Sequence, residues 1–189
     1  MPAQCAVPRL LLITGAPASG KTRLARDLGT RYGCGIGSKD EIKETLFEVL
    51  GTGDAAWSRR LSDASFALLF SFAPQLLAAH CLVLLEGNFR VGEHEAPLRS
   101  LLERSGAGAA QVLCLAEPAT RAARLAARAA DPGRHRGHHD RRIDVSAGDG
   151  ATFLDLPGPR LRFNSEADWQ SELAAFCAEF DRWYSPPKV

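Results

Sequence analysis

The sequence has few lysines, no CxxC pair and no long hydrophobic run. Cys81 and Cys114 lie at or within apolar runs, so we predict that the cysteines are reduced core thiols. No stretch of 18 or more apolar residues occurs, and residues 1–8 lack a basic segment that leads into one. We therefore expect a soluble, cytoplasmic protein that does not contact a membrane.

Charge of either sign is also not in excess. The 23 basic and 22 acidic residues nearly cancel, so net charge alone gives no reason to expect nucleic acid or a membrane surface as a partner. Arginine greatly outnumbers lysine, which makes Lys21 an unusual residue for this chain. A length of 189 residues with 46% apolar residues is enough for a real core. We expect one domain over residues 1–189.

Strand-like and helix-like segments alternate along the chain, without internal repeats. Short, mostly apolar segments predict parallel strands at residues 9–14, 35–37, 81–86, 110–115 and 161–163. Helical spacing predicts helices after the first strand up to residue 32, and then at residues 39–50, 57–79, 95–105, 118–130 and 166–184. The alternation predicts an α/β fold with five parallel strands and intervening helices.

The clearest motif follows the first predicted strand and opens the first predicted helix. It matches GxxxxGK[ST] and consists of Gly15, Ala16, Pro17, Ala18, Ser19, Gly20, Lys21 and Thr22, a segment that we call the phosphate loop. Its glycines let backbone N–H groups approach phosphate oxygens. Lys21 is predicted to bridge the β- and γ-phosphates, and the Thr22 hydroxyl to bind Mg²⁺. The loop predicts ATP and Mg²⁺ as ligands.

An acidic residue ends the third predicted strand. Because parallel strands open at the same edge of the sheet, the Glu86 carboxylate is expected near the phosphate loop, where it can reach Mg²⁺ directly or through water. Its alternative interpretation is a polar strand boundary. Asn88 and Arg90 follow on a loop at the same edge, where they either bind acceptor or phosphate or are only solvated.

A candidate general base follows the second predicted strand. Asp40 is expected at the same edge of the sheet as the phosphate loop. A carboxylate there can take the proton of an acceptor hydroxyl as the hydroxyl oxygen bonds to phosphorus. A helix also begins at this point, so Ser38 or Asp40 is expected to cap it, which does not exclude catalysis. The acceptor pocket is expected to be lined by loops and by apolar residues of segment 57–79.

Arginines cluster on the fifth predicted helix and beyond it. Arg121, Arg124 and Arg128 share a helix face, and Arg134 follows in a Gly- and His-rich excursion. We predict an arginine-rich lid over about residues 121–150, with Arg124, Arg128 and Arg134 as the residues that stabilise charge on the transferred phosphoryl group. The alternatives are a solvated helix face and, at His135, His138, His139 and Asp140, a structural zinc site.

These motifs together resemble small P-loop kinases, the AAA-type ATP-binding group that includes chloramphenicol phosphotransferase and the zeta-toxin kinases. The resemblance rests on the phosphate loop and on segments 38–44, 85–89 and 134–138. It implies a three-layer P-loop NTPase fold with strand order 2-3-1-4-5. It also implies that Asp40 activates the acceptor and that the arginines between 124 and 136 form the lid. Arg136 stands where related sequences often have proline.

A phosphate loop, a base and an arginine lid in one domain predict an ATP-dependent phosphotransferase that modifies a hydroxyl of a small-molecule acceptor. A nucleoside, nucleotide or polynucleotide 5′-hydroxyl kinase is the alternative, because a basic lid also suits a phosphorylated acceptor. A regulatory NTPase without an acceptor is a third possibility, although the base-reading motif of GTPases is not found. The sequence does not indicate the oligomeric state.

Overall fold

Strands and helices alternate in the computed structural model, which describes residues 7–131 and 151–184. The strands are β1 (Arg9–Gly15), β2 (Gly35–Ser38), β3 (Leu82–Glu86), β4 (Gly108–Leu115) and β5 (Arg160–Asn164). The helices are α1 (Lys21–Tyr32), α2 (Lys39–Leu50), α3 (Ala55–Ala79), α4 (Glu95–Ser105), α5 (Pro118–Ala130) and α6 (Trp169–Trp183). Each of the predicted elements is therefore present.

The strands form one parallel sheet in the order β2-β3-β1-β4-β5. This confirms both the parallel sheet that the apolar runs predict and the order implied by the resemblance. β1 lies in the centre, paired with β3 on one side and β4 on the other. The phosphate loop therefore leaves the middle of the sheet, with the ends of β3 and β4 beside it.

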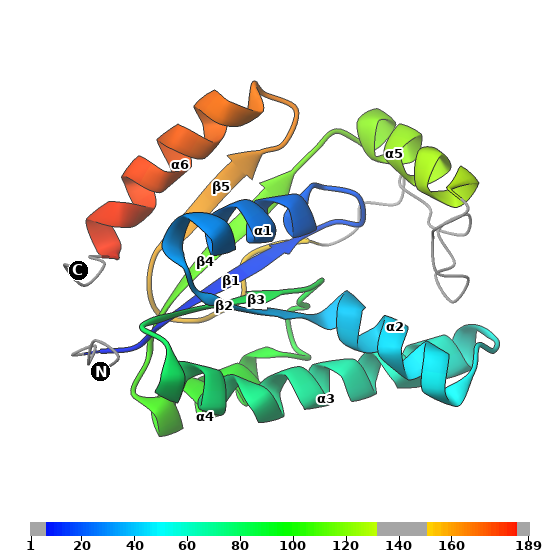
Figure 1. Ribbon diagram of the computed structural model, residues 1–189, viewed down its shortest axis with the longest axis horizontal. Helices are drawn as coiled ribbons and strands as arrows, with labels where there is room; N and C mark the ends of the chain where they lie inside the picture. Colours follow the sequence, from blue (N-terminus) through cyan, green and yellow to red (C-terminus); the bar gives the residue numbers. More distant parts are fainter. Residues whose placement is uncertain (1–6, 132–150, 185–189) are drawn as a thin grey trace.

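Helices cover both faces of the sheet, which gives three layers (Figure 1). The side chains of β1 alternate between the layers: Leu11 and Ile13 pack with α1 and α6, whereas Leu10 and Leu12 pack with α3 and α4. This alternation is the period of two that a strand imposes. Each layer has its own apolar core, so the sheet is buried on both faces, as expected for parallel strands.

Helix α3 is long and apolar enough to cross a membrane, by length and composition alone. Its inward residues Phe66, Leu69, Ala73 and Leu77 belong to the core beneath the sheet. Its first half also carries Arg59, Arg60 and Asp63. The chain accordingly uses α3 as a core helix of a soluble kinase-like fold.

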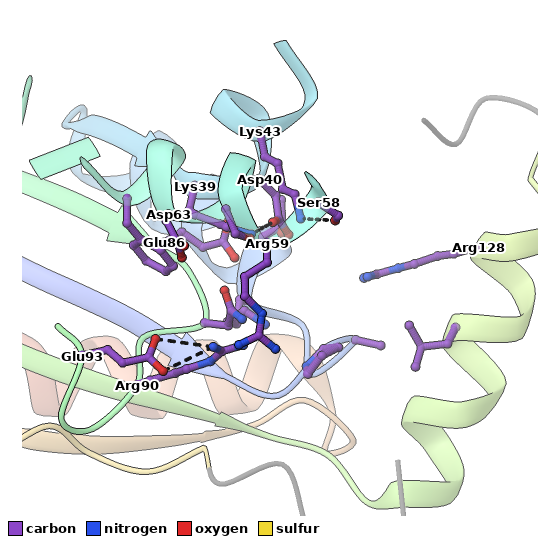
Figure 2. A pocket seen from close by; sticks show the side chains of 18 of the residues that line it. Lys39, Asp40, Lys43, Ser58, Arg59, Asp63, Glu86, Arg90, Glu93 and Arg128 are labelled. Carbon is purple, nitrogen blue, oxygen red and sulfur yellow. Dashed lines mark hydrogen bonds and ion pairs between the residues drawn. The ribbon is translucent and has the colours of Figure 1, made fainter. Parts of the chain in front are cut away.

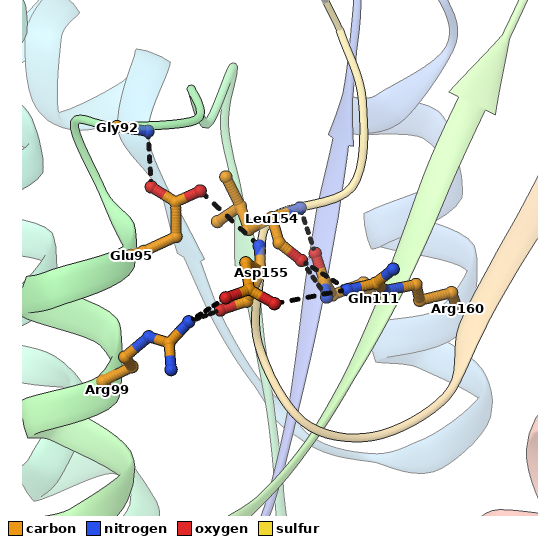
Figure 3. Close-up of polar contacts among 7 residues, drawn as sticks. All are labelled: Gly92, Glu95, Arg99, Gln111, Leu154, Asp155 and Arg160. Atoms are coloured by element: carbon orange, nitrogen blue, oxygen red, sulfur yellow. Dashed lines mark hydrogen bonds and ion pairs between the residues drawn. The ribbon is translucent and has the colours of Figure 1, made fainter.

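The segment that leads into β5 is fixed by polar contacts (Figure 3). The buried Gln111 side chain of β4 donates to Leu154 O at 3.1 Å and accepts from Leu154 N at 2.8 Å. Next to it, Asp155 pairs with Arg99 of α4 and with Arg160 of β5. These contacts hold the β5 edge of the sheet against α4 and β4.

Candidate functional site

The phosphate loop has the backbone that close approach to an anion requires. Gly15 and Gly20 have φ values of 146° and 95°, and Ala18 also has a positive φ of 63°. A Cβ on Gly15 would lie 2.5 Å from Cys114 O, so glycine is required there. The first turn of α1 has no side-chain cap and no acidic residue, which leaves its N–H groups to bind an anion.

Lys21 closes the loop on itself. Its side chain is 8% exposed, and Nζ donates a hydrogen bond to Ala16 O at 2.7 Å. Burial lowers the pKa of Lys21, whereas the neighbouring Glu86 carboxylate raises it. A phosphate group placed in the loop would favour the charged amine and offset this cost.

Glu86 lies at the end of β3 beside Lys21, where the sequence predicts it. It is 1% exposed and accepts a hydrogen bond from Ser38 Oγ at 3.0 Å. Burial raises the pKa of Glu86, and Lys21 and the Ser38 hydrogen bond oppose that rise. A cation at this position would stabilise the carboxylate, so Glu86 and the nearby Thr22 hydroxyl form an oxygen donor set that fits Mg²⁺ with water ligands.

Asp40 lies at the start of α2, on the other side of the same opening. Ser38 is the N-cap of this helix, so Asp40 is free of that role and its side chain is half-exposed. The ammonium group of Lys39 lies 3.0 Å from Asp40 Oδ1 and itself is buried, near the Phe66 ring. Lys39 thus holds the carboxylate at the edge of the opening.

A pocket of about 530 Å³ connects these groups (Figure 2). It is lined by the phosphate loop (Pro17, Ala18, Gly20, Lys21, Thr22), by the start of α2 (Lys39, Asp40, Lys43), by α3 (Ala55, Ser58, Arg59, Ser62, Asp63, Phe66), by β3 and its loop (Glu86, Asn88, Arg90, Glu93) and by α5 (Leu125, Arg128). The structure therefore brings most of the predicted site residues to a single cavity.

The α3 wall of this pocket differs from the prediction. Segment 57–79 was expected to supply apolar lining, but the residues that it contributes are Ser58, Arg59, Ser62, Asp63 and Phe66. Phe66 is the apolar member of this set, whereas Leu69, Ala73 and Leu77 pack against the sheet. The helix passes the pocket with its more polar first half, so this wall is mostly polar and charged.

The buried face of α2 is also different from the one that its apolar spacing suggests. Val49 and Leu50 are 75% and 54% exposed, whereas the buried residues of α2 are Lys39, Lys43 and Phe47. Apolar spacing does not predict Lys39 and Lys43 as pocket residues. The rarity of lysine could have revealed them, because three of the chain's four lysines, at positions 21, 39 and 43, line this pocket.

The arginines of α5 take three different positions. Arg121 is buried, and Arg128 is exposed and lines the pocket. Arg124 donates to Ala18 O of the phosphate loop at 3.1 Å and to Ser165 Oγ and O at 2.8 and 3.0 Å. Arg124 thereby ties α5 to the loop. Arg134 and most of the predicted lid (residues 132–150) lie outside the described residues, as do the histidines of the alternative zinc site.

The loop after β3 is supported by a buried imidazole. The Arg90 backbone N–H donates to His94 Nδ1 at 2.8 Å, and the His94 ring packs 4.0 Å from the ring of Phe66. Burial lowers the pKa of His94, which keeps Nδ1 available as an acceptor. Asn88 and Arg90 therefore lie on a loop that is held in place by the core between the sheet and helices α3 and α4.

Comparison with known proteins shows the family of this chain. A family model described as an AAA domain matches residues 10–146, which include the phosphate loop, Asp40, Glu86 and all of α5. The chain belongs to this AAA domain family. A search of curated proteins found no match to this chain.

Several solved structures resemble this chain. A candidate kinase from Chloroflexus aurantiacus is 29% identical, with a TM-score of 0.80 over 91% of this chain and 98% of that one. The APS kinase of Mycobacterium tuberculosis, in complex with AMPPNP and APS, is 18% identical, with a TM-score of 0.56 over 94% and 99%. A sugar kinase from Janibacter is 10% identical, with a TM-score of 0.61 over 93% and 95%. The fold is that of a nucleotide-binding P-loop kinase.

Proposed function

We propose that this AAA domain is an ATP-dependent phosphotransferase that moves the γ-phosphoryl group to a hydroxyl of a small-molecule acceptor. The observation that carries the proposal is the shared pocket, which has the phosphate loop on one wall and Asp40 on the other. A nucleotide-binding module without an acceptor has no need of a pocket that extends beyond its phosphate site to a carboxylate on a second helix. The kinases of similar structure support the same reaction class.

The chain's own groups divide the work. The phosphate loop and Lys21 bind the β- and γ-phosphates, and Thr22 and Glu86 would hold Mg²⁺, which would offset the charge of the phosphates. Asp40 accepts the proton of the acceptor hydroxyl as the new O–P bond forms. The bond between the γ-phosphorus and the bridging oxygen breaks, and ADP leaves with that oxygen. Arg128 faces the same space from α5 and stabilises charge on the transferred group.

The test is transfer of labelled γ-phosphate from ATP to a panel of acceptors. The panel contains sugars and polyols, hydroxylated antibiotics, nucleosides, nucleotides and 5′-hydroxyl oligonucleotides. We expect a labelled product with the wild-type protein and none with Asp40→Asn. ATP hydrolysis that is equal in both proteins, with no product from any acceptor, would count against the proposal and favour a regulatory NTPase.

A further inference from the structure

Lys43 is a buried amine that faces the acceptor side of the pocket. It lies one helical turn beyond Lys39, and its side chain is 8% exposed. Its Nζ donates to Ser58 Oγ of α3 at 2.9 Å and lies 5.3 Å from the centre of the Phe47 ring. None of the ion pairs between described residues includes Lys43. An ammonium group is therefore held in the pocket wall by a neutral hydroxyl and an aromatic face.

This arrangement is costly for the fold. Burial and, to a smaller extent, the charge of Lys39 lower the pKa of Lys43 to about 8, although Asp40 and Asp63 oppose the change. A leucine or methionine could fill the same space without desolvating a charge. A buried charge that destabilises the fold is a candidate for a functional role.

Two arginines line the same pocket. Arg59 follows Ser58 on α3, and Arg90 stands on the loop after β3 (Figure 2). Arg59 takes part in none of the ion pairs between described residues, and Arg90 is paired only with the exposed Glu93, at 3.4 Å. Two carboxylates, Asp63 and Glu93, also line this part of the pocket. The three cations Lys43, Arg59 and Arg90 therefore exceed them by one charge.

We propose that the acceptor carries an oxyanion group (a phosphate, sulfate or carboxylate) besides its reactive hydroxyl, and that Lys43 is the main residue that binds it. Arg59 and Arg90 complete the subsite from α3 and from the β3–α4 loop. The inference rests on the proposed function, because it takes the pocket beyond Asp40 as the acceptor site. A neutral acceptor would leave Lys43 without a direct ion pair among the described residues, whereas an oxyanion forms charge-assisted hydrogen bonds with it.

The subsite is separate from the phosphate loop. Lys21 and Arg128 face the pocket from α1 and α5, and Lys43 and Arg59 face it from α2 and α3. Asp40 precedes Lys43 by about one turn of α2. An acceptor bound with its oxyanion at Lys43 therefore lies along α2, with its hydroxyl end toward Asp40.

The first experiment measures anion binding without any transfer. The protein is saturated with a non-hydrolysable ATP analogue and Mg²⁺ to occupy the phosphate loop, and inorganic phosphate, sulfate and acetate are titrated separately by calorimetry. We expect Lys43→Met to raise the dissociation constant of phosphate about tenfold or more, which is the size of a lost charge-assisted hydrogen bond. Sulfate and acetate show which oxyanion geometry the wall prefers.

Two neighbouring arginines provide a matched control. Arg59 lines the pocket, whereas Arg60 is exposed, does not line it and lies over the Trp57 ring. Arg59→Ala should weaken phosphate binding several-fold, and Arg60→Ala should leave it unchanged. Equal phosphate affinity in wild-type and Lys43→Met proteins, or no phosphate binding to the wild type, would overturn the proposal.

The second experiment separates this inference from the proposed function. Labelled transfer is measured with pairs of acceptors that differ only in charge, namely polyols and nucleosides and their phosphate esters. Transfer to the esters that falls with Lys43→Met supports the subsite. Transfer to the esters and to the neutral members with the same kcat/KM in both proteins overturns the subsite and leaves the kinase function standing. Lys43-dependent phosphate binding with no transfer to any member retains the subsite and counts against the kinase function.

Discussion

Ser38 Oγ donates a hydrogen bond to Glu86 Oε2 at 3.0 Å, and this contact joins the carboxyl ends of β2 and β3. The same oxygen accepts from Glu41 N at 3.5 Å as the N-cap of α2. One hydroxyl therefore connects the carboxylate proposed to bind Mg²⁺ with the helix that carries Asp40. The nucleotide side and the acceptor side of the pocket are fixed relative to each other through this residue.

Ser38→Ala should lower the free energy of unfolding by about 1–2 kcal/mol, because it removes a helix cap and the donor to a buried carboxylate. Without that donor the pKa of Glu86 rises further, so a higher Mg²⁺ concentration should be needed for ATP binding. Urea denaturation and Mg²⁺ titrations measure the two effects. Ser105→Ala removes a comparable hydroxyl on α4, whose Oγ donates to Leu101 O, and should change stability alone. An unaltered Mg²⁺ requirement in Ser38→Ala would be inconsistent with this link.

Lys21→Ala and Asp40→Asn should have different effects. Lys21→Ala removes the amine at the phosphate loop and should weaken ATP binding by about 100-fold, as the loss of a charged contact to two phosphates predicts. Asp40→Asn keeps the size of the side chain and should retain ATP affinity while slowing transfer about 10²–10⁴-fold. Calorimetry with ATP and single-turnover transfer measure these quantities. A similar loss of ATP affinity in both variants would remove Asp40 from the role of base.

Sulfate binding should weaken as the pH rises through about 8, because that is the pKa of Lys43 and the neutral amine does not hold an anion. The groups that set this value are Lys39 and Asp40 on α2 and Asp63 on α3. The Lys43→Met variant should lack this pH dependence. Sulfate titrations at pH 7 and 9.5 measure it, because sulfate stays dianionic throughout, and the same slope in both proteins would speak against Lys43.

Stability should change with pH in the opposite sense. The Lys43 pKa lies below its usual value of 10.5, so between about pH 8 and 10.5 the unfolded chain binds more protons than the folded one. The cost of burying this charge, about 3 kcal/mol at neutral pH, is therefore relieved as the pH rises. Lys43→Met should be as stable as the wild type or more stable at pH 7, with the difference shrinking by pH 9.5 in urea denaturation. A variant that is markedly less stable at pH 7 would indicate a structural role instead.

His94 should make the protein sensitive to acid. Its folded pKa lies below the usual 6.5, so the unfolded chain binds the extra proton first as the pH falls below 6.5, and stability decreases. Glu93, Arg90 and Glu95 are the charged groups around it. His94→Asn offers a side-chain acceptor that does not titrate, and its melting temperature should fall less steeply between pH 7 and 5. Parallel melting curves for the two proteins would contradict the role assigned to this imidazole.

The sequence was sufficient for the elements and the phosphate loop, because both depend on local patterns. The first residues of some elements differ from the predicted ones, and these differences have local and tertiary causes. α3 begins at Ala55 because Asp54 caps it through Trp57 N at 2.8 Å, and α6 begins after the cap Asp168. β4 extends back to Gly108 because the strand pairs there with Arg9 of β1, a contact that a single-strand pattern does not contain.

The acceptor side could not be predicted in the same way. Hydrophobic spacing assigns the buried face of a helix to its apolar residues, but α2 buries Lys39 and Lys43. This happens because the start of α2 faces a pocket and not the apolar core. Ser58 and Arg59 belong to a helix whose overall composition is apolar, so a pattern averaged over α3 hides the polar turn that contacts Lys43.

The concentration of lysine in the pocket has a chemical consequence. An amine reacts with acylating reagents only in its neutral form, and Lys43 loses its proton at a lower pH than an ordinary lysine. Lys21, Lys39 and Lys43 are all buried in the pocket wall, whereas the abundant arginines do not react under these conditions. A small acylating reagent used near pH 8 would therefore modify Lys43 faster than an equally accessible lysine of ordinary pKa, and ligands that fill the pocket could be found by their protection of Lys43 in peptide mass spectra.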